Sequence, residues 1–249
     1  MDEELLAGWR AAPFAELGWA DRDGRPQAVT VVPLVADGQP LMALTYDRLE
    51  VARGLADAAE VSLSVTSPML NGGRTPTSAT VQVEVREDPD GEEFVAAYLP
   101  QELAKHPPSR RYADSPLLCS EHRWYLPRLL VRATQVRGVR EHAFRDALAL
   151  SVVDGRAQVD TVDLDGHTST PVLTSPLPDG PVAILQHGAD LPDLELPWWR
   201  RWRGTVRAGH LEAFTFDQRP PRVVPPGVWR RWRDEVAFEK ACRAGLASR

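Results

Sequence analysis

Short apolar and polar runs alternate along the first quarter of the chain, and Asp-Gly pairs separate these runs. Asp23-Gly24 and Asp37-Gly38 each stand between two apolar or β-branched runs. This arrangement is typical of tight hairpins, because glycine accepts the positive φ that such turns need. Two successive hairpins predict a three-stranded meander over residues 14–45. A short helix over 48–58 and a strand over 60–65 are expected to follow it.

Three further patterns predict elements before residue 135. Residues 79–86 alternate, with valines on one face and polar side chains on the other, which indicates a half-buried strand. Residues 92–105 carry apolar side chains near helical spacing, and Pro100 is expected to interrupt or end that helix. Residues 123–132 return to strand character, and Pro127 restricts this strand to an edge or a bulge.

Asp-Gly turns recur in the second half of the chain. Three apolar runs there predict strands: 147–153, 156–162 and 181–185. The spacing from Asp165 to Asp179 equals that from Asp23 to Asp37, and both second pairs precede a proline and an apolar strand. The match indicates a degenerate second copy of the first half. Coincidence is the alternative, because Asp-Gly turns occur in any meander.

The pentapeptide Trp-Arg-Arg-Trp-Arg occurs at 199–203 and again at 229–233, where a helix is predicted over 228–246. Tryptophans three residues apart share one face of a helix. The indoles can dock onto the protein while the guanidinium groups stay solvated, or the clusters can contact an acidic ligand, a nucleic acid or a membrane surface. We favour docking, because Glu235 and Glu239 dilute the charge of the second cluster.

Composition narrows the classes of protein and partner. The chain has 249 residues, 43% of them hydrophobic, and a formal net charge of −6. It lacks an apolar run of 18 residues and begins with acidic side chains, so we expect a cytoplasmic protein without a membrane partner. The negative charge argues against nucleic acid. Two distant cysteines and six histidines without metal-ligand spacing give no support to a metal site.

Common catalytic loops are absent from the sequence: there is no Gly-x-Gly-x-x-Gly, no Walker-type loop and no Gly-x-Ser-x-Gly elbow. The arginine-bearing stretch Ser109–Tyr112 is a candidate contact for an anionic substrate, and a solvated loop explains it equally well. Among the histidines, His122 is the candidate to lie near a bound ring, because Trp124 is close to it in the sequence.

The succession of two Asp-Gly hairpins, a short helix and the strand Val61–Val65 resembles the flavin-binding split barrels related to pyridoxamine 5'-phosphate oxidase. The resemblance covers about residues 12–135. It implies a mostly β fold with flanking helices (α+β), built on a split β-barrel, with the degenerate second half as an extension. The expected division is 1–138 for the barrel, 139–217 for the second half, and 218–249 for a Pro-rich linker and helix.

In that family, FMN lies against the second and third strands, and basic and hydroxyl side chains near the start of the helix hold its phosphate. By position, the resemblance implies these cofactor-binding residues: Thr30, Val31, Thr45, Tyr46, Arg48, Arg53 and Trp124. The cofactor usually lies between two barrels, which implies a homodimer unless the second half completes a pseudo-dimer within one chain.

One departure from the family concerns the phosphate. Many members have a lysine where this chain has Val51, and the first 104 residues contain no lysine at all. Arginine can replace it, since its planar fork meets a phosphate with two hydrogen bonds. The leading hypothesis is therefore an oxidoreductase that binds FMN, or deazaflavin F420, and acts on a small molecule. The alternative is a split-barrel protein that binds haem or has no cofactor.

Overall fold

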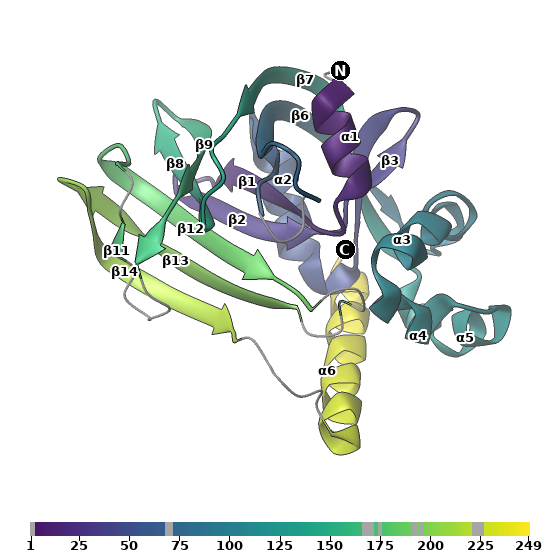
Figure 1. Ribbon diagram of the computed structural model, residues 1–249. Coiled ribbons are helices and arrows are strands. Elements are labelled where there is room, and N and C mark those ends of the chain that lie inside the picture. Colours follow the sequence, from purple (N-terminus) through teal and green to yellow (C-terminus); the bar gives the residue numbers. More distant parts are fainter. Residues whose placement is uncertain are drawn as a thin grey trace.

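The computed structural model describes residues 3–67, 72–165, 172–173, 176–190, 194, 197–220 and 227–249. Two antiparallel sheets, a layer of short helices and a long C-terminal helix make up this part of the chain (Figure 1). The prediction of a mostly β fold with flanking helices is confirmed. Within these ranges every helix is too short or too polar to cross a bilayer.

The larger sheet has seven strands. In order across the sheet they are β2 (Pro26–Val31), β1 (Ala15–Ala20), β5 (Val61–Val65), β6 (Thr77–Asp88), β7 (Arg128–Glu141), β4 (Gln39–Leu44) and β3 (Leu34–Ala36). Helices α1 (Glu3–Ala11) and α2 (Leu49–Asp57) contribute the fully buried Trp9 and Leu55 to the core of this sheet. Burial of such large apolar side chains is the main stabilising term of the barrel half.

Both predicted hairpins are confirmed, but the predicted three-stranded meander is wrong. Gly24 and Gly38 have φ values of 73° in the β1–β2 and β3–β4 turns. The expected middle strand breaks after Val31, and its two pieces, β2 and β3, lie at opposite edges of the sheet. Pro33 between them has no amide hydrogen and so cannot continue the ladder of β2.

A helical layer connects β6 to β7. It comprises a π-helical turn (Phe94–Tyr98), α3 (Leu99–Lys105), a 3-10 turn (Pro107–Ser109), α4 (Arg110–Ala113), α5 (Pro116–Glu121) and a second 3-10 turn (Arg123–Tyr125). The helix predicted over 92–105 is present, and its geometry changes at Leu99, next to Pro100. The strand predicted over 123–132 starts only at Arg128, because residues 123–125 form the 3-10 turn and Pro127 follows it.

The smaller sheet has five strands from the second half of the chain. Their order is β14 (His210–Arg219), β13 (Trp198–Arg207), β12 (Gly180–Gly188), β8 (Ala147–Val153) and β9 (Arg156–Val162). The predicted strands 147–153 and 156–162 coincide with β8 and β9, and β12 contains the predicted strand 181–185. A separate two-stranded ladder joins β10 (Leu164–Asp165) to β11 (Val172–Leu173).

The five strands repeat the topology of the larger sheet. The order β9-β8-β12-β13-β14 corresponds strand for strand to β2-β1-β5-β6-β7, and the β10–β11 hairpin corresponds to β3–β4. Asp154-Gly155 therefore takes the place of Asp23-Gly24, one hairpin earlier than the sequence spacing indicated. Residues 176–179, which precede β12, form no helix, so the counterpart of α2 is missing among the described residues there.

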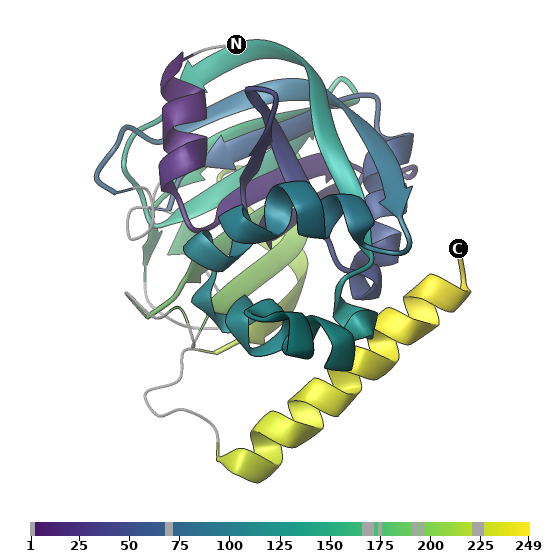
Figure 2. The ribbon, with the colours of Figure 1, turned by 90° about the vertical axis from the view of Figure 1, so that its right-hand side faces the viewer.

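The two Trp-Arg-Arg-Trp-Arg segments differ in structure. The first lies in β13, so the expectation that its tryptophans share one face of a helix is wrong, although Trp202 is buried in the smaller sheet. The second lies in α6 (Val228–Ala247), beside the helical layer (Figure 2). There Trp229 is 79% exposed and Trp232 is 57% exposed. The prediction that the indoles dock onto the protein is therefore confirmed for Trp202 and wrong for Trp229 and Trp232.

The two sheets pack against each other through β1, β2 and β5 of the larger and β8, β9 and β12 of the smaller. Gly18 of β1 faces Leu150 of β8 so closely that a Cβ atom would lie 2.7 Å from a Leu150 methyl carbon. A buried hydrogen bond lies beside this contact, where His187 Nε2 of β12 is 2.7 Å from Glu16 Oε1 of β1. The same carboxylate accepts hydrogen bonds from Thr66.

Candidate functional site

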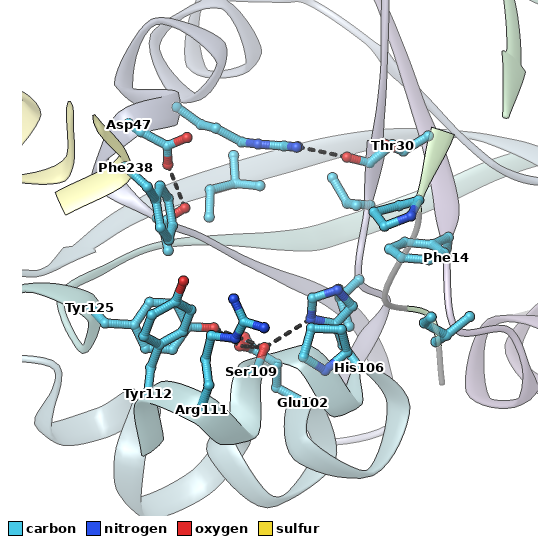
Figure 3. Close-up of a pocket in the computed structure, with 18 of the residues that line it drawn as sticks. Phe14, Thr30, Asp47, Glu102, His106, Ser109, Arg111, Tyr112, Tyr125 and Phe238 are labelled. Atoms are coloured by element: carbon cyan, nitrogen blue, oxygen red, sulfur yellow. Dashed lines mark hydrogen bonds between the residues drawn. The ribbon is translucent and has the colours of Figure 1, made fainter. Parts of the chain in front are cut away.

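A cavity of about 500 Å³ lies where the two halves, the helical layer and α6 meet (Figure 3). One wall consists of the ends of β2 and β4 and the 3-10 turn Tyr46–Arg48 that follows β4. Residues 102–112 form the opposite wall. Leu194, Pro197, Trp199 and Arg219 from the second half and residues 231–238 of α6 close the remaining sides. Its volume lies within the range typical of small-molecule and cofactor sites.

Four residues that the sequence predicted line the strand side of this cavity: Thr30, Val31, Thr45 and Arg48. Arg48 Nη1 donates a hydrogen bond to the carbonyl oxygen of Thr30 at 2.6 Å. Burial lowers the pKa of Arg48, and Arg201 acts in the same direction while Asp47 opposes it. The hydroxyl of Thr45 donates to the carboxylate of Asp47. Arg48 and Thr45 thus both have hydrogen-bond partners within the chain.

The other three predicted residues lie away from the cavity. Tyr46 is buried, and its hydroxyl donates to Glu87 Oε2 at 3.2 Å. Burial and, to a lesser extent, Glu87 raise the pKa of Tyr46 to about 12. Trp124 packs edge-on against Tyr112 and Phe238, behind the residues that face the cavity.

Arg53 lines a different cavity, which lies beside the β1–β2 and β8–β9 turns. Its guanidinium pairs with Glu50 at 2.7 Å and donates to the carbonyl of Ser248. The structure therefore does not bring Arg53 together with Arg48. Val51, at the position of the family's lysine, packs half-buried against the core of the larger sheet.

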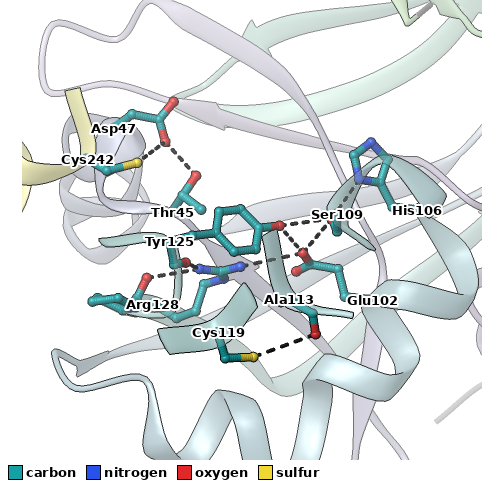
Figure 4. Close-up of polar contacts among 11 residues, drawn as sticks. Thr45, Asp47, Glu102, His106, Ser109, Ala113, Cys119, Tyr125, Arg128 and Cys242 are labelled. Carbon is teal, nitrogen blue, oxygen red and sulfur yellow. Dashed lines mark hydrogen bonds and ion pairs between the residues drawn. The ribbon is translucent and has the colours of Figure 1, made fainter. Parts of the chain in front are cut away.

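A chain of buried polar groups forms the helical side of the cavity (Figure 4). Glu102 Oε1 accepts hydrogen bonds from the hydroxyls of Ser109, at 2.8 Å, and Tyr125. Ser109 Oγ is also 2.9 Å from His106 Nδ1, and His106 lines the cavity. Arg128, fully buried beneath this chain, lies 3.5 Å from Glu102 Oε1 and compensates the negative charge of that carboxylate.

Arg128 fixes the helical layer to the start of β7. Its guanidinium stacks over the rings of Phe94 and Tyr125, at 3.8 and 4.3 Å from their centroids, and donates to the carbonyls of Tyr125 and Pro127. Burial, with Glu102 close by, raises the pKa of Tyr125 far above its usual range, so this hydroxyl stays protonated as a donor. The cluster is thus a rigid base for the side chains that face the cavity.

Sequence reasoning did not identify His106, Glu102 or Tyr125. It singled out Ser109–Tyr112 as an arginine-bearing stretch, and Ser109, Arg111 and Tyr112 do line the cavity. His122 lies instead beside Tyr112 and Trp124 and does not face the cavity. The only sequence signal for His106 is its position directly before Pro107-Pro108, which ends α3 and starts a new turn.

The cavity walls carry both charge and aromatic surface. Phe14, Tyr112, Trp199 and Phe238 provide rings from four separate parts of the chain. Cys242 of α6 lies behind the strand side, with its Sγ 4.0 Å from Asp47 Oδ1. Burial and Asp47 raise the pKa of Cys242 to about 12, so this thiol stays protonated at neutral pH. The described residues contain no group of three or more potential metal ligands.

No family model and no curated protein matches the chain. Solved structures with similar folds cover 56% of it. A candidate pyridoxamine 5'-phosphate oxidase from Lactobacillus delbrueckii has 16% identity, 93% of its own chain covered and a TM-score of 0.37. The haem storage protein HutZ from Vibrio cholerae has 14% identity, 93% covered and a TM-score of 0.37. An F420 reductase has 19% identity, 98% covered and a TM-score of 0.38. Similarity this low carries no argument about function.

Proposed function

We propose that the cavity binds a flavin-type cofactor, FMN or deazaflavin F420, and that the protein is an oxidoreductase acting on a small molecule. The observation that carries the proposal is the coincidence of four sequence-predicted residues, among them Arg48, on one wall of a cavity with aromatic side chains on its other walls. A planar ring system fits between such side chains, and a guanidinium suits an anionic tail.

The residues present fit such a group, with one feature against it. Thr30, Thr45 and Arg48 provide hydroxyls and a positive charge at the position that the family uses for phosphate. Asp47 places a carboxylate beside them and accepts a hydrogen bond from Thr45, while Arg48 donates to the carbonyl oxygen of Thr30. To bind a phosphate, Thr45 and Arg48 must leave these partners and donate to the ligand instead. A bound flavin would supply the electron-transfer chemistry, while the chain binds it, orients it and excludes water.

An absorbance spectrum of the purified protein, before and after addition of FMN, tests this function. We expect flavin absorbance and release of FMN on denaturation. Arg48→Ala should weaken FMN binding by about 10- to 100-fold, the effect of losing charge-assisted hydrogen bonds. Arg53→Ala should leave the affinity unchanged, because Arg53 lies at the other cavity. Equal effects of the two variants would contradict the assignment of the phosphate to Arg48.

A binding role without flavin is the second candidate. Val51, half-buried against the core, and the existing hydrogen bonds of Thr45 and Arg48 favour a cavity in which the chain itself occupies the place of a phosphate. A colourless protein that takes up neither FMN nor F420 would support this candidate and exclude the first. A Soret band in the same spectrum would identify haem as the ligand.

A further inference from the structure

His106 presents one ring nitrogen to the protein and the other to the cavity. Its Nδ1 is 2.9 Å from Ser109 Oγ. Its Nε2 has no hydrogen-bond partner among the residues that the structure describes, and the ring edge that carries it is turned toward the strand side of the cavity (Figure 3). Phe14 packs edge-on against the ring, with the centroids 5.6 Å apart, and so fixes its plane.

The hydrogen bonds behind His106 determine which nitrogen carries the proton. Ser109 has a single hydroxyl proton, and Glu102, a carboxylate 2.8 Å away, is its strongest acceptor. Ser109 Oγ therefore accepts a hydrogen bond from His106, which requires the proton on Nδ1. The neutral imidazole then has a lone pair on Nε2, directed at whatever occupies the cavity.

The charges around His106 favour its neutral form. Burial lowers its pKa, and the guanidinium groups of Arg48, Arg111 and Arg219 act in the same direction, whereas Glu102 opposes them. These groups belong to the 3-10 turn after β4, α4, β14 and α3, which are the elements that surround the ring. At neutral pH the ring is thus a hydrogen-bond acceptor that faces the cavity.

We infer that His106 is a ligand-binding residue, whose Nε2 accepts a hydrogen bond from an N–H or O–H group on the ring system in the cavity, and that Ser109 and Glu102 hold the required tautomer. The inference rests on the proposed function for the identity of that ring system. The imide N–H of an isoalloxazine is a donor of this class, and so is a ring hydroxyl of a substrate.

Riboflavin and FMN are the probes for a binding test across pH. Riboflavin lacks the phosphate, whose own titration near pH 6 would overlap with that of histidine. For the wild-type protein we expect the dissociation constant of riboflavin to rise as pH falls below the pKa of His106, by up to about tenfold per pH unit, because protonation removes the acceptor. His106→Gln should abolish this dependence, and the exposed His210→Gln should retain it.

Ser109→Ala isolates the positioning role. It removes the acceptor of Nδ1–H, so we expect roughly fivefold weaker riboflavin binding. Nitrogen chemical shifts of His106 in the ligand-free wild type should show the Nδ1–H tautomer, and those in Ser109→Ala should show a mixture. A Nε2–H tautomer in the wild type, or an unchanged pH profile in His106→Gln, overturns the inference. Failure of the wild type to bind either flavin overturns the proposed function instead.

Discussion

Gly18 lies at a close contact between the two halves of the molecule. Gly18→Ala would place a Cβ atom 2.7 Å from the side chain of the fully buried Leu150, so that side chain or the backbone around it must shift. We expect a loss of about 1–3 kcal/mol in the free energy of unfolding, measured by urea denaturation. In a protein that already carries Leu150→Ala, the further loss caused by Gly18→Ala should be smaller, and a double-mutant cycle measures this difference. Gly8→Ala, with no neighbouring atom within 4 Å, is the control and should not destabilise.

Because Lys105 is partly buried, the stability of the fold is expected to vary with pH in the alkaline range. Its Nζ donates to the carbonyls of Trp9 and Pro33, and burial lowers its pKa from 10.5 to about 8. Between these two pH values the unfolded chain binds more protons than the folded one, so the folded state gains stability as pH rises. We expect the free energy of unfolding to rise, relative to Lys105→Met, by at most about 3 kcal/mol between pH 7 and pH 10. A difference that stays constant with pH would contradict this.

The residues of the site differ in how far the sequence predicted them. Thr30, Thr45 and Arg48 were implied by the resemblance to the split barrels, through their place in the succession of hairpins and helix. The helix that carries Glu102 was predicted, but no sequence pattern indicates that Glu102, His106 and Tyr125 meet, because tertiary packing brings them together. Arg53 was misplaced because it lies five residues beyond Arg48, within α2. Five residues of an α-helix separate two side chains by about 140° around the helix axis, so Arg48 and Arg53 face different sides.

Helix α6 has two halves with different roles. Phe238 lines the cavity and packs against Trp124, with ring centroids 5.3 Å apart, whereas Trp229 near the other end is largely exposed. Phe238→Ala should lower the free energy of unfolding by about 2–4 kcal/mol and weaken flavin binding. Trp229→Ala should change neither quantity measurably. Equal effects of both substitutions, in urea denaturation and in a flavin titration, would contradict this division of the helix.

Strand periodicity predicted β8 and β9 residue for residue, because alternation and an Asp-Gly turn are both local signals. For the first Trp-Arg-Arg-Trp-Arg segment, the local pattern indicated a helix, and this prediction was wrong. Three-residue spacing of tryptophans is compatible with a helix, but ladder pairing of β13 with β12 and β14 determines its conformation, and that pairing is not visible in the segment itself. The break of the predicted meander at Pro33 likewise depends on which edge each strand joins.

The two sheets of the molecule have corresponding strand orders and meet through corresponding strands. β1, β2 and β5 correspond by strand order to β8, β9 and β12. The contacts between the halves come in exchanged pairs: β2 meets β12 as β9 meets β5, and β1 meets β9 as β8 meets β2. A surface that contacts its own counterpart in this way is typical of a twofold dimer interface. Since the second half lacks a counterpart of α2 among its described residues, the two halves differ where the first one forms the cavity.

This arrangement predicts a monomer that binds one flavin. Trp199 and Arg219 of the second half already line the cavity. We expect light scattering to give the mass of one chain and titration to give one FMN per chain. Trp199→Ala should weaken FMN binding by about tenfold through loss of a ring contact. The neighbouring Trp198→Ala, which points to the opposite face of β13, should change stability rather than affinity. A dimer with a flavin that is insensitive to Trp199→Ala would show that a second chain, and not the second half, completes the site.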